Sequence, residues 1–228
     1  MKRTTHLLQT RDGIRISIHL YHQEEEAELL IISPGFFKSK ETLIFQRMAR
    51  ALAVNRAVLC MDFRGHGRSG GLYTFSALES ADLQAVLVFA RERYQRIGIL
   101  GFSLGGAIAI NTLSRFREQV FSLVTVSAPC IFEEIEFKIW GPGVIRRGIS
   151  CLERGSGCHP GNPFLEKERP LDHVGQLGGL PVLIVHGDRD GVVSVKHGQR
   201  LFRQAREPKR LEIIRGGGHA EMLFREEP

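Results

Sequence analysis

A length of 228 residues, of which 43% are hydrophobic and 25% charged, excludes a disordered chain and indicates a domain large enough to bury a core. No apolar run approaches the roughly 20 residues of a membrane-spanning helix, and polar residues follow Lys2 and Arg3 where a secretion signal would be apolar. We therefore expect a cytoplasmic protein. The net charge of +6 is spread along the chain and no nucleic-acid motif is present, which argues against a nucleic-acid partner.

The predicted elements begin with a hairpin, because β-rich segments at 7–9 and 14–20 flank the turn dipeptide Asp12-Gly13. From there, short apolar runs predict strands at 29–32, 57–61, 97–100, 123–126, 182–185 and 211–214. Helices are predicted at 40–54, 77–94, 104–115 and 195–206, the second with a capping box of Ser76 and Glu79. This alternation predicts an α/β fold in which an eight-stranded, mostly parallel sheet carries helices on both faces.

The alternation of strands and helices stops between residues 126 and 182. The segment from Cys130 to Leu177 is rich in Gly and Pro and also contains many apolar residues. A loop of this length inside a compact domain usually serves a function, often as a lid. We therefore expect one domain over residues 1–228, with a small cap inserted at about 130–177.

Cysteine usage indicates neither disulfides nor a metal site. Without a secretion signal, Cys60, Cys130, Cys151 and Cys158 are expected to be reduced thiols. Cys151, Cys158 and His159 could be considered as metal ligands. However, six residues separate the two cysteines, and the sequence has no second cysteine pair to complete a zinc site. We expect no metal and no cofactor.

The motif Gly-x-Ser-x-Gly occurs twice, in different contexts. Gly101-Phe102-Ser103-Leu104-Gly105 follows an apolar strand and leads into a helix of small residues, so the turn would expose the Ser103 hydroxyl beside a helix N-terminus. The second match, at 67–71, has no strand directly before it and no helix after it. It overlaps a match to G-x-G-x-x-G at 65–70, which lacks the helix of a dinucleotide site. We interpret both of these matches as one tight glycine loop.

Four segments together resemble the α/β-hydrolase superfamily. Segment 101–105 is similar to its nucleophile elbow, 62–69 to its structural loop, 186–193 to its acid turn and 216–219 to its histidine loop. The resemblance runs from about residue 29 to 219, is weakest in the cap, and is closest to small esterases of the monoacylglycerol-lipase-like and feruloyl-esterase-like types.

The resemblance implies a catalytic triad of Ser103 as nucleophile, His219 as base and Asp190 as the acid that orients it. Asp188 is the alternative acid. The other histidines in glycine turns, His66 and His186, are expected to pack.

The oxyanion hole implied by the resemblance uses the backbone amides of Leu104 and Phe36. In its loop, Pro34 replaces the usual histidine, so the contacts that support the loop are not predicted. Candidates for the substrate pocket are Phe37, Phe132, Trp140 and Val192.

The expected activity is hydrolysis of a small-molecule carboxylic ester with a short-to-medium acyl or aryl acid. Cleavage of a thioester, amide, lactone or carbon–carbon bond would use the same triad, and a non-catalytic binding protein of hydrolase descent is the alternative from another class. The sequence contains no signal for an oligomeric state.

Overall fold

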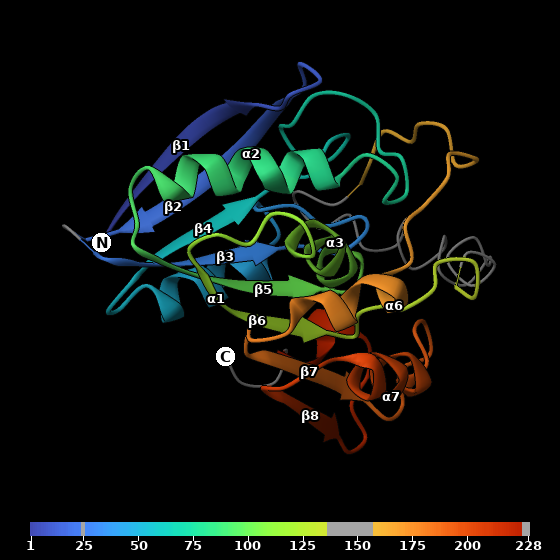
Figure 1. Cartoon of the computed structure of the whole chain (residues 1–228). Coiled ribbons are helices and arrows are strands. Elements are labelled where there is room, and N and C mark those ends of the chain that lie inside the picture. The colour runs from blue at the N-terminus through green and yellow to red at the C-terminus, as the bar shows by residue number, and fades with distance from the viewer. Residues whose placement is uncertain (24–25, 136–156, 225–228) are drawn as a thin grey trace.

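The computed structural model describes residues 1–23, 26–135 and 157–224. An eight-stranded sheet with the order β1-β2-β4-β3-β5-β6-β7-β8 lies at its centre (Figure 1). The strands are β1 (Lys2–Gln9), β2 (Arg15–His22), β3 (Glu28–Ser33), β4 (Ala57–Met61), β5 (Arg96–Phe102), β6 (Val120–Val126), β7 (Val182–Gly187) and β8 (Lys209–Ile214). The β1–β2 and β2–β4 pairings are antiparallel and the others are parallel, which confirms the predicted fold class.

Helices cover both faces of the sheet (Figure 1). One core contains side chains of α2 (Ser80–Arg91), α3 (Leu104–Leu113), η1 (Val174–Leu177) and α7 (Val195–Gln204), and the short α6 (Pro170–His173) lies on the same side. The opposite core contains side chains of α1 (Leu43–Leu52) and η2 (Ala220–Phe224). The neighbours Ile31 and Ile32 are both 0% exposed and belong to opposite cores. Successive strand residues face opposite sides, so a strand covered on both faces has a continuous apolar run.

The predicted capping box of Ser76 and Glu79 is wrong. Helix α2 begins at Ser80, and Ser76 has a φ of 80° with its hydroxyl buried and unpartnered among the described residues. The Glu79 carboxylate instead accepts hydrogen bonds from the amide (2.6 Å) and the hydroxyl (3.0 Å) of Thr74. The Thr74 hydroxyl oxygen in turn accepts from the Leu78 amide at 3.0 Å. A separate turn therefore precedes α2, and Thr74 takes the role that the sequence pattern assigned to Ser76.

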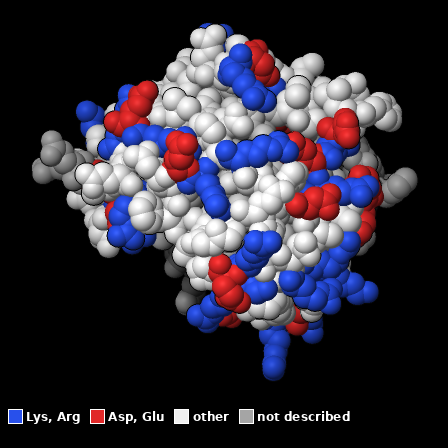
Figure 2. All heavy atoms as spheres, viewed as in Figure 1, with Lys and Arg blue, Asp and Glu red and all other residues white. Residues whose placement is uncertain are grey.

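Charged side chains of both signs are mixed over the face shown in Figure 2, although basic groups predominate at its lower right. Some of the basic side chains of α7 and β8 are paired. Arg200 bonds to Glu134 at 2.7 Å, and the Lys209 ammonium donates to the carbonyl oxygen of Ala205 at 2.7 Å. Within the described ranges, no helix has both the length and the apolar character needed to cross a bilayer.

Candidate active site

Ser103 lies in the sharp turn between β5 and α3. Its φ is 49°, a left-handed value that costs a non-glycine residue about 1–2 kcal/mol, and its amide donates to the Val126 carbonyl at 2.7 Å. A Cβ built on Gly105 would lie only 2.3 Å from the Ser33 carbonyl oxygen, and one on Gly101 would lie 2.5 Å from the Gly106 Cα. Both glycines of the motif are therefore required by the close approach of neighbouring backbone.

The structure brings Ser103, His219 and Asp190 together in one hydrogen-bonded chain. The Ser103 Oγ lies 3.0 Å from His219 Nε2, and His219 Nδ1 lies 2.8 Å from Asp190 Oδ2. Because a carboxylate only accepts, Nδ1 must carry the imidazole proton, which leaves the Nε2 lone pair facing the serine hydroxyl. That arrangement is the one in which a histidine can take a proton from serine.

Asp190 is held as an anion at the start of this chain. Its Oδ1 accepts from the amides of Val192 and Val193, both at 2.9 Å. Burial alone would raise the pKa of Asp190, but the hydrogen bond and charge of His219, with those two amides, lower it overall. Asp188 has a different contact: its Oδ1 accepts from the Gly216 amide at 2.7 Å. The alternative acid therefore braces the loop that carries His219 instead of facing its imidazole.

His186 is a second imidazole next to Asp190, which the sequence analysis assigned only to packing. The His186 side chain is fully buried. Its Nε2 lies 2.8 Å from the Val193 carbonyl oxygen and 3.5 Å from Asp190 Oδ2. Burial lowers the pKa of His186, which keeps the ring neutral. Its position four residues before Asp190 was the available signal for this contact.

The backbone after His219 is held by residues that the motifs did not indicate. Ala220 has a φ of 48°, and its amide donates to the buried Ser127 hydroxyl oxygen at 3.0 Å. The next residue, Glu221, lies 3.3 Å from the Lys38 ammonium. Lys38 follows the loop expected to form the oxyanion hole, so this ion pair joins that loop to the histidine loop.

The expected oxyanion loop lies directly against Ser103. A Cβ built on Gly35 would lie 3.2 Å from the Ser103 Cβ, and Ser33 is paired with Gly101 in the sheet. Among the hydrogen bonds of the described residues, none uses the amide of Phe36 or Leu104 as its donor.

The second Gly-x-Ser-x-Gly match is structural. The Ser69 hydroxyl donates to the Asp62 carbonyl at 2.8 Å and accepts from the Ser17 amide at 2.9 Å. The Asp62 side chain accepts from the Lys40 ammonium and the Arg68 amide, and Asp62 and Lys40 are both fully buried. This loop is thus an internally bonded support, and no histidine or carboxylate side chain of the described residues is hydrogen-bonded to the Ser69 hydroxyl.

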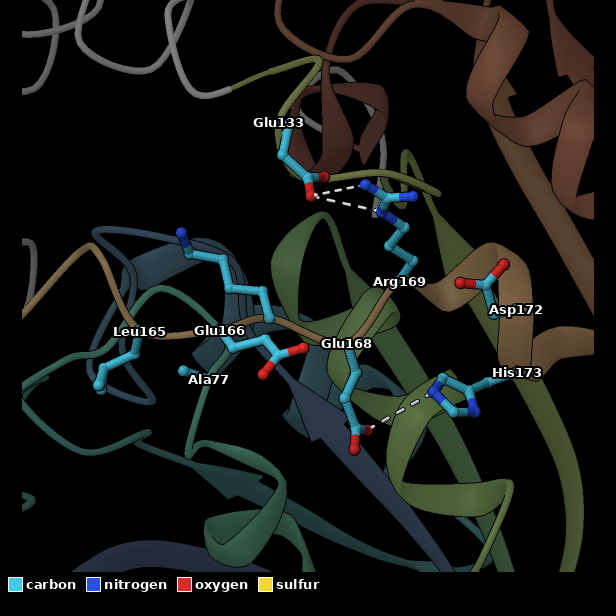
Figure 3. Close-up of a pocket in the computed structure, with 9 residues that line it drawn as sticks. Ala77, Glu133, Leu165, Glu166, Glu168, Arg169, Asp172 and His173 are labelled. Atoms are coloured by element: carbon cyan, nitrogen blue, oxygen red, sulfur yellow. Dashed lines mark hydrogen bonds and ion pairs between the residues drawn. The ribbon is translucent and has the colours of Figure 1, made fainter.

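The predicted pocket residues have different locations. Phe37 and Val192 are half-buried near the site, whereas Phe132, at the start of the predicted cap, is 2% exposed and packs in the core that contains α2 and α3. Trp140 and most of the first half of the predicted cap lie outside the described residues. An open hollow of about 780 Å³ lies between Ala77, Glu133 and the segment 165–173 (Figure 3). Its lining is polar and contains no member of the triad.

Polar contacts join the two ends of the predicted cap to each other and to the helices below. Glu133 lies 3.2 Å from Arg169 (Figure 3). The Leu171 amide also donates to the Cys130 carbonyl at 3.1 Å. The Cys130 amide also donates to His197 Nδ1 at 3.2 Å. Both stems of the cap are thereby fixed close to the active site.

The sequence matches one family over more than half of its length. This family is described as the alpha/beta hydrolase fold, and the match covers residues 28–147. The chain is 26% identical over 174 residues to the uncharacterized protein YfhR of Escherichia coli (strain K12), covering 73% of this chain and 54% of that protein. It is 24% identical over 176 residues to human alpha/beta hydrolase domain-containing protein 17B, covering 74% of this chain and 52% of that protein. The chain thus spans about half the length of these curated relatives.

Solved structures share the fold at low sequence identity. The esterase Pf2001 of Pyrococcus furiosus has a TM-score of 0.77 and 20% identity, covering 99% of this chain and 85% of that one. The alpha/beta hydrolase GrgF from Penicillium sp. sh18 has a TM-score of 0.76 and 18% identity, covering 99% of this chain and 94% of that one. These likenesses show the fold, and the family match confirms the resemblance to α/β hydrolases that the sequence motifs indicated.

Proposed function

Because the chain belongs to the alpha/beta hydrolase fold family, we propose that it is a serine hydrolase that cleaves carboxylic esters through Ser103. The observation that supports this most strongly is the hydrogen-bonded chain from Ser103 Oγ through His219 to Asp190, at 3.0 and 2.8 Å. Three side chains from three separate loops have no packing reason to align in this order. Nucleophilic catalysis requires this alignment.

In the first half-reaction, Ser103 Oγ forms a bond to the ester carbonyl carbon while its proton passes to His219 Nε2. The carbonyl oxygen becomes an oxyanion, which the amides of Phe36 and Leu104 stabilise. The imidazolium then gives its proton to the leaving alkoxide as the carbon–oxygen bond breaks. An acyl group remains on Ser103, and the alcohol departs.

In the second half-reaction, water takes the place of the alcohol. His219 accepts a proton from water as the water oxygen bonds to the acyl carbon, and the same amides stabilise the new oxyanion. Collapse of this intermediate breaks the bond to Ser103, which regains its proton from His219, and the carboxylic acid is released. Asp190 stays ionised throughout and stabilises the imidazolium.

The substrate we propose is a soluble ester of a short-to-medium acyl or aryl acid. Phe37, half-buried next to the oxyanion loop with its ring centroid 4.1 Å from that of Phe36, is the described aromatic side chain that we propose contacts the acyl group. Each methylene group of the acyl chain held in such a pocket adds at most about 0.8 kcal/mol, so kcat/KM should rise a few-fold per carbon until the pocket is full.

The cellular setting is proposed from the cysteines. Cys60, Cys130 and Cys158 are free thiols, which supports a reducing compartment such as the cytoplasm. We also propose that residues 1–228 work as one domain, with the cap at about 130–177 as the substrate-facing insertion.

The function can be tested with a fluorophosphonate probe, which reacts with an activated serine. We expect one covalent adduct by intact mass, located on Ser103 and absent from Ser103→Ala. Ser69→Ala is the matched control and should label as the unaltered protein does. A series of nitrophenyl esters of increasing acyl length then measures preference. Faster turnover of emulsified long-chain fat than of soluble esters would contradict the proposed substrate class.

A further inference from the structure

Phe37 is held in a backbone conformation that it would not adopt by itself. Its φ is 63°, which lies in the left-handed region and costs a non-glycine residue about 1–2 kcal/mol. Such a conformation persists only where the surrounding structure imposes it. The residue follows Phe36 directly, and only φ and ψ of Phe36 separate the two amides, so whatever holds Phe37 also restrains the Phe36 amide.

The amide of Phe37 is held by His66. This histidine is 2% exposed, and its Nδ1 lies 3.1 Å from the Arg64 carbonyl oxygen, which can only accept. Nδ1 therefore carries the proton, and Nε2 accepts a hydrogen bond from the Phe37 amide at 3.3 Å. Burial lowers the pKa of His66 to about 4, so the ring stays a neutral acceptor at neutral pH.

The carbonyl of Phe37 is held by the returning end of the predicted cap. The Gly157 amide donates to the Phe37 carbonyl oxygen at 3.0 Å. The segment 157–161 is itself fixed, because the His159 amide donates to the Gly65 carbonyl (2.7 Å) and the Tyr73 amide donates to the His159 carbonyl (2.9 Å). Both backbone polar groups of Phe37 are thus bonded to the loop of residues 62–73 or to the segment paired with it.

We propose that His66 and Gly157 are the supports of the oxyanion loop, and that His66 is a positioning residue that aims the Phe36 amide at the oxyanion. This inference rests on the proposed function. Pro34 has neither an amide hydrogen nor a polar side chain, so the hydrogen bonds of His66 and Gly157 with Phe37 supply support that Pro34 cannot give. The Phe36 ring is fixed in addition by stacking on Tyr73, with centroids 5.2 Å apart and planes 24° apart.

A purely structural role for His66 is the competing explanation, since its ring also packs edge-on against Tyr73 at a centroid distance of 4.6 Å. The two explanations predict different variants to be active. His66→Phe keeps a ring of similar size but has no acceptor for the Phe37 amide. His66→Gln loses the ring but can present a carbonyl oxygen near the position of Nε2.

The kinetic test compares these two variants on a soluble nitrophenyl ester. Loss of one oxyanion donor costs about 10²–10³ in kcat, so a misdirected Phe36 amide should lower kcat of His66→Phe about 10–100-fold. KM should stay within about threefold, because the contact acts in the transition state. The inhibition constant of a trifluoromethyl ketone, which forms an oxyanion on the nucleophile, should rise by the same factor as kcat falls. His66→Gln should recover most of the loss.

A matched control is His19→Phe, which removes another buried histidine, 3% exposed, from β2. Its kinetics should equal those of the unaltered protein. The inference is overturned if folded His66→Phe has unaltered kcat. It is also overturned if the activity of His66→Phe and His66→Gln falls only in proportion to their folded fractions.

The contact itself can be observed independently of activity. In ¹⁵N-labelled protein, a scalar coupling across the hydrogen bond should connect the Phe37 amide nitrogen with His66 Nε2, and it should be absent from His66→Phe. Absence of the coupling in the folded, unaltered protein overturns the inference whatever the activity is. If the unaltered protein shows no Ser103-dependent turnover, the proposed function fails instead, and the positioning role of His66 fails with it.

Discussion

Replacing Asp190 by asparagine exploits an asymmetry in the surroundings of this side chain. One carboxylate oxygen accepts from the amides of Val192 and Val193, and the other faces His219 Nδ1. In Asp190→Asn, the amide oxygen must take the first position, because an NH₂ group there would meet two N–H donors. The NH₂ group is then directed at His219.

That placement forces the wrong tautomer on the imidazole. Nδ1 has to become the acceptor for the new donor, so the proton moves to Nε2 and points at Ser103 Oγ, 3.0 Å away. A histidine in this state cannot accept the serine proton. Loss of the orienting acid in this way costs about 10⁴ in kcat, which corresponds to about 5 kcal/mol of transition-state stabilisation.

The assay is steady-state hydrolysis of a nitrophenyl ester, with ¹⁵N NMR of the histidine ring to assign the tautomer. Asp188→Asn is the matched control. Its amide oxygen can still accept from Gly216 as the carboxylate does at 2.7 Å, and the residue is exposed, so kcat should change by less than about threefold. Large loss in Asp188→Asn together with normal turnover in Asp190→Asn would refute the assignment of the acid. Normal turnover with the proton shown on Nε2 would refute the tautomer argument.

The remaining predictions concern the nucleophile and pH. Ser103→Ala should lower kcat about 10⁶-fold. Ser69→Ala should keep the chemical step but lose about 1–3 kcal/mol of unfolding free energy, because the Ser69 hydroxyl joins two backbone groups. Equal kinetic losses in the two folded variants would contradict the elbow assignment. The value of kcat/KM should rise from acid to neutral pH, since His219 accepts a proton only when neutral; a flat profile with chemistry rate-limiting would exclude a histidine base. The free energy of unfolding should fall as pH drops from 6.5 towards 4, because the imidazole of His66 binds a proton near pH 6.5 in the unfolded chain and only near pH 4 in the native protein. His66 should account for about 3 kcal/mol of this fall. Chemical denaturation at both pH values should therefore show a smaller change for His66→Gln than for the unaltered protein.

The fold was predictable because its signals are local. Apolar runs alternating with amphipathic stretches identify the strands and helices, and the glycines of segment 101–105 mark the one turn that brings β5 and α3 this close. The helix starts were less predictable. Ser76 and Thr74 both offer a hydroxyl before α2, and only the conformation of the chain between them selects Thr74 as the acceptor.

The geometry of the active site was predictable only where a motif fixes the spacing. Asp190 and His219 follow strand ends at positions that the resemblance specifies, so their meeting could be foreseen. The contacts of His66 with Phe37 and of Ser127 with Ala220 connect residues that are distant in sequence, and no periodic pattern marks them. A histidine in a glycine turn has the same local sequence whether it packs or accepts a hydrogen bond.

The separation between Ser103 and His219, 116 residues along the chain, has a consequence for biosynthesis. As the chain leaves the ribosome, the nucleophile, its elbow and the oxyanion loop emerge long before the base, which follows the last strand, β8. Domains fold as their chains are synthesised, and distant contacts close last. Under the mechanism we propose, a nascent chain that ends before His219 displays a serine without its base. Its hydroxyl would then stay inert until the final edge strand has joined the sheet, and the onset of activity would report the completion of folding.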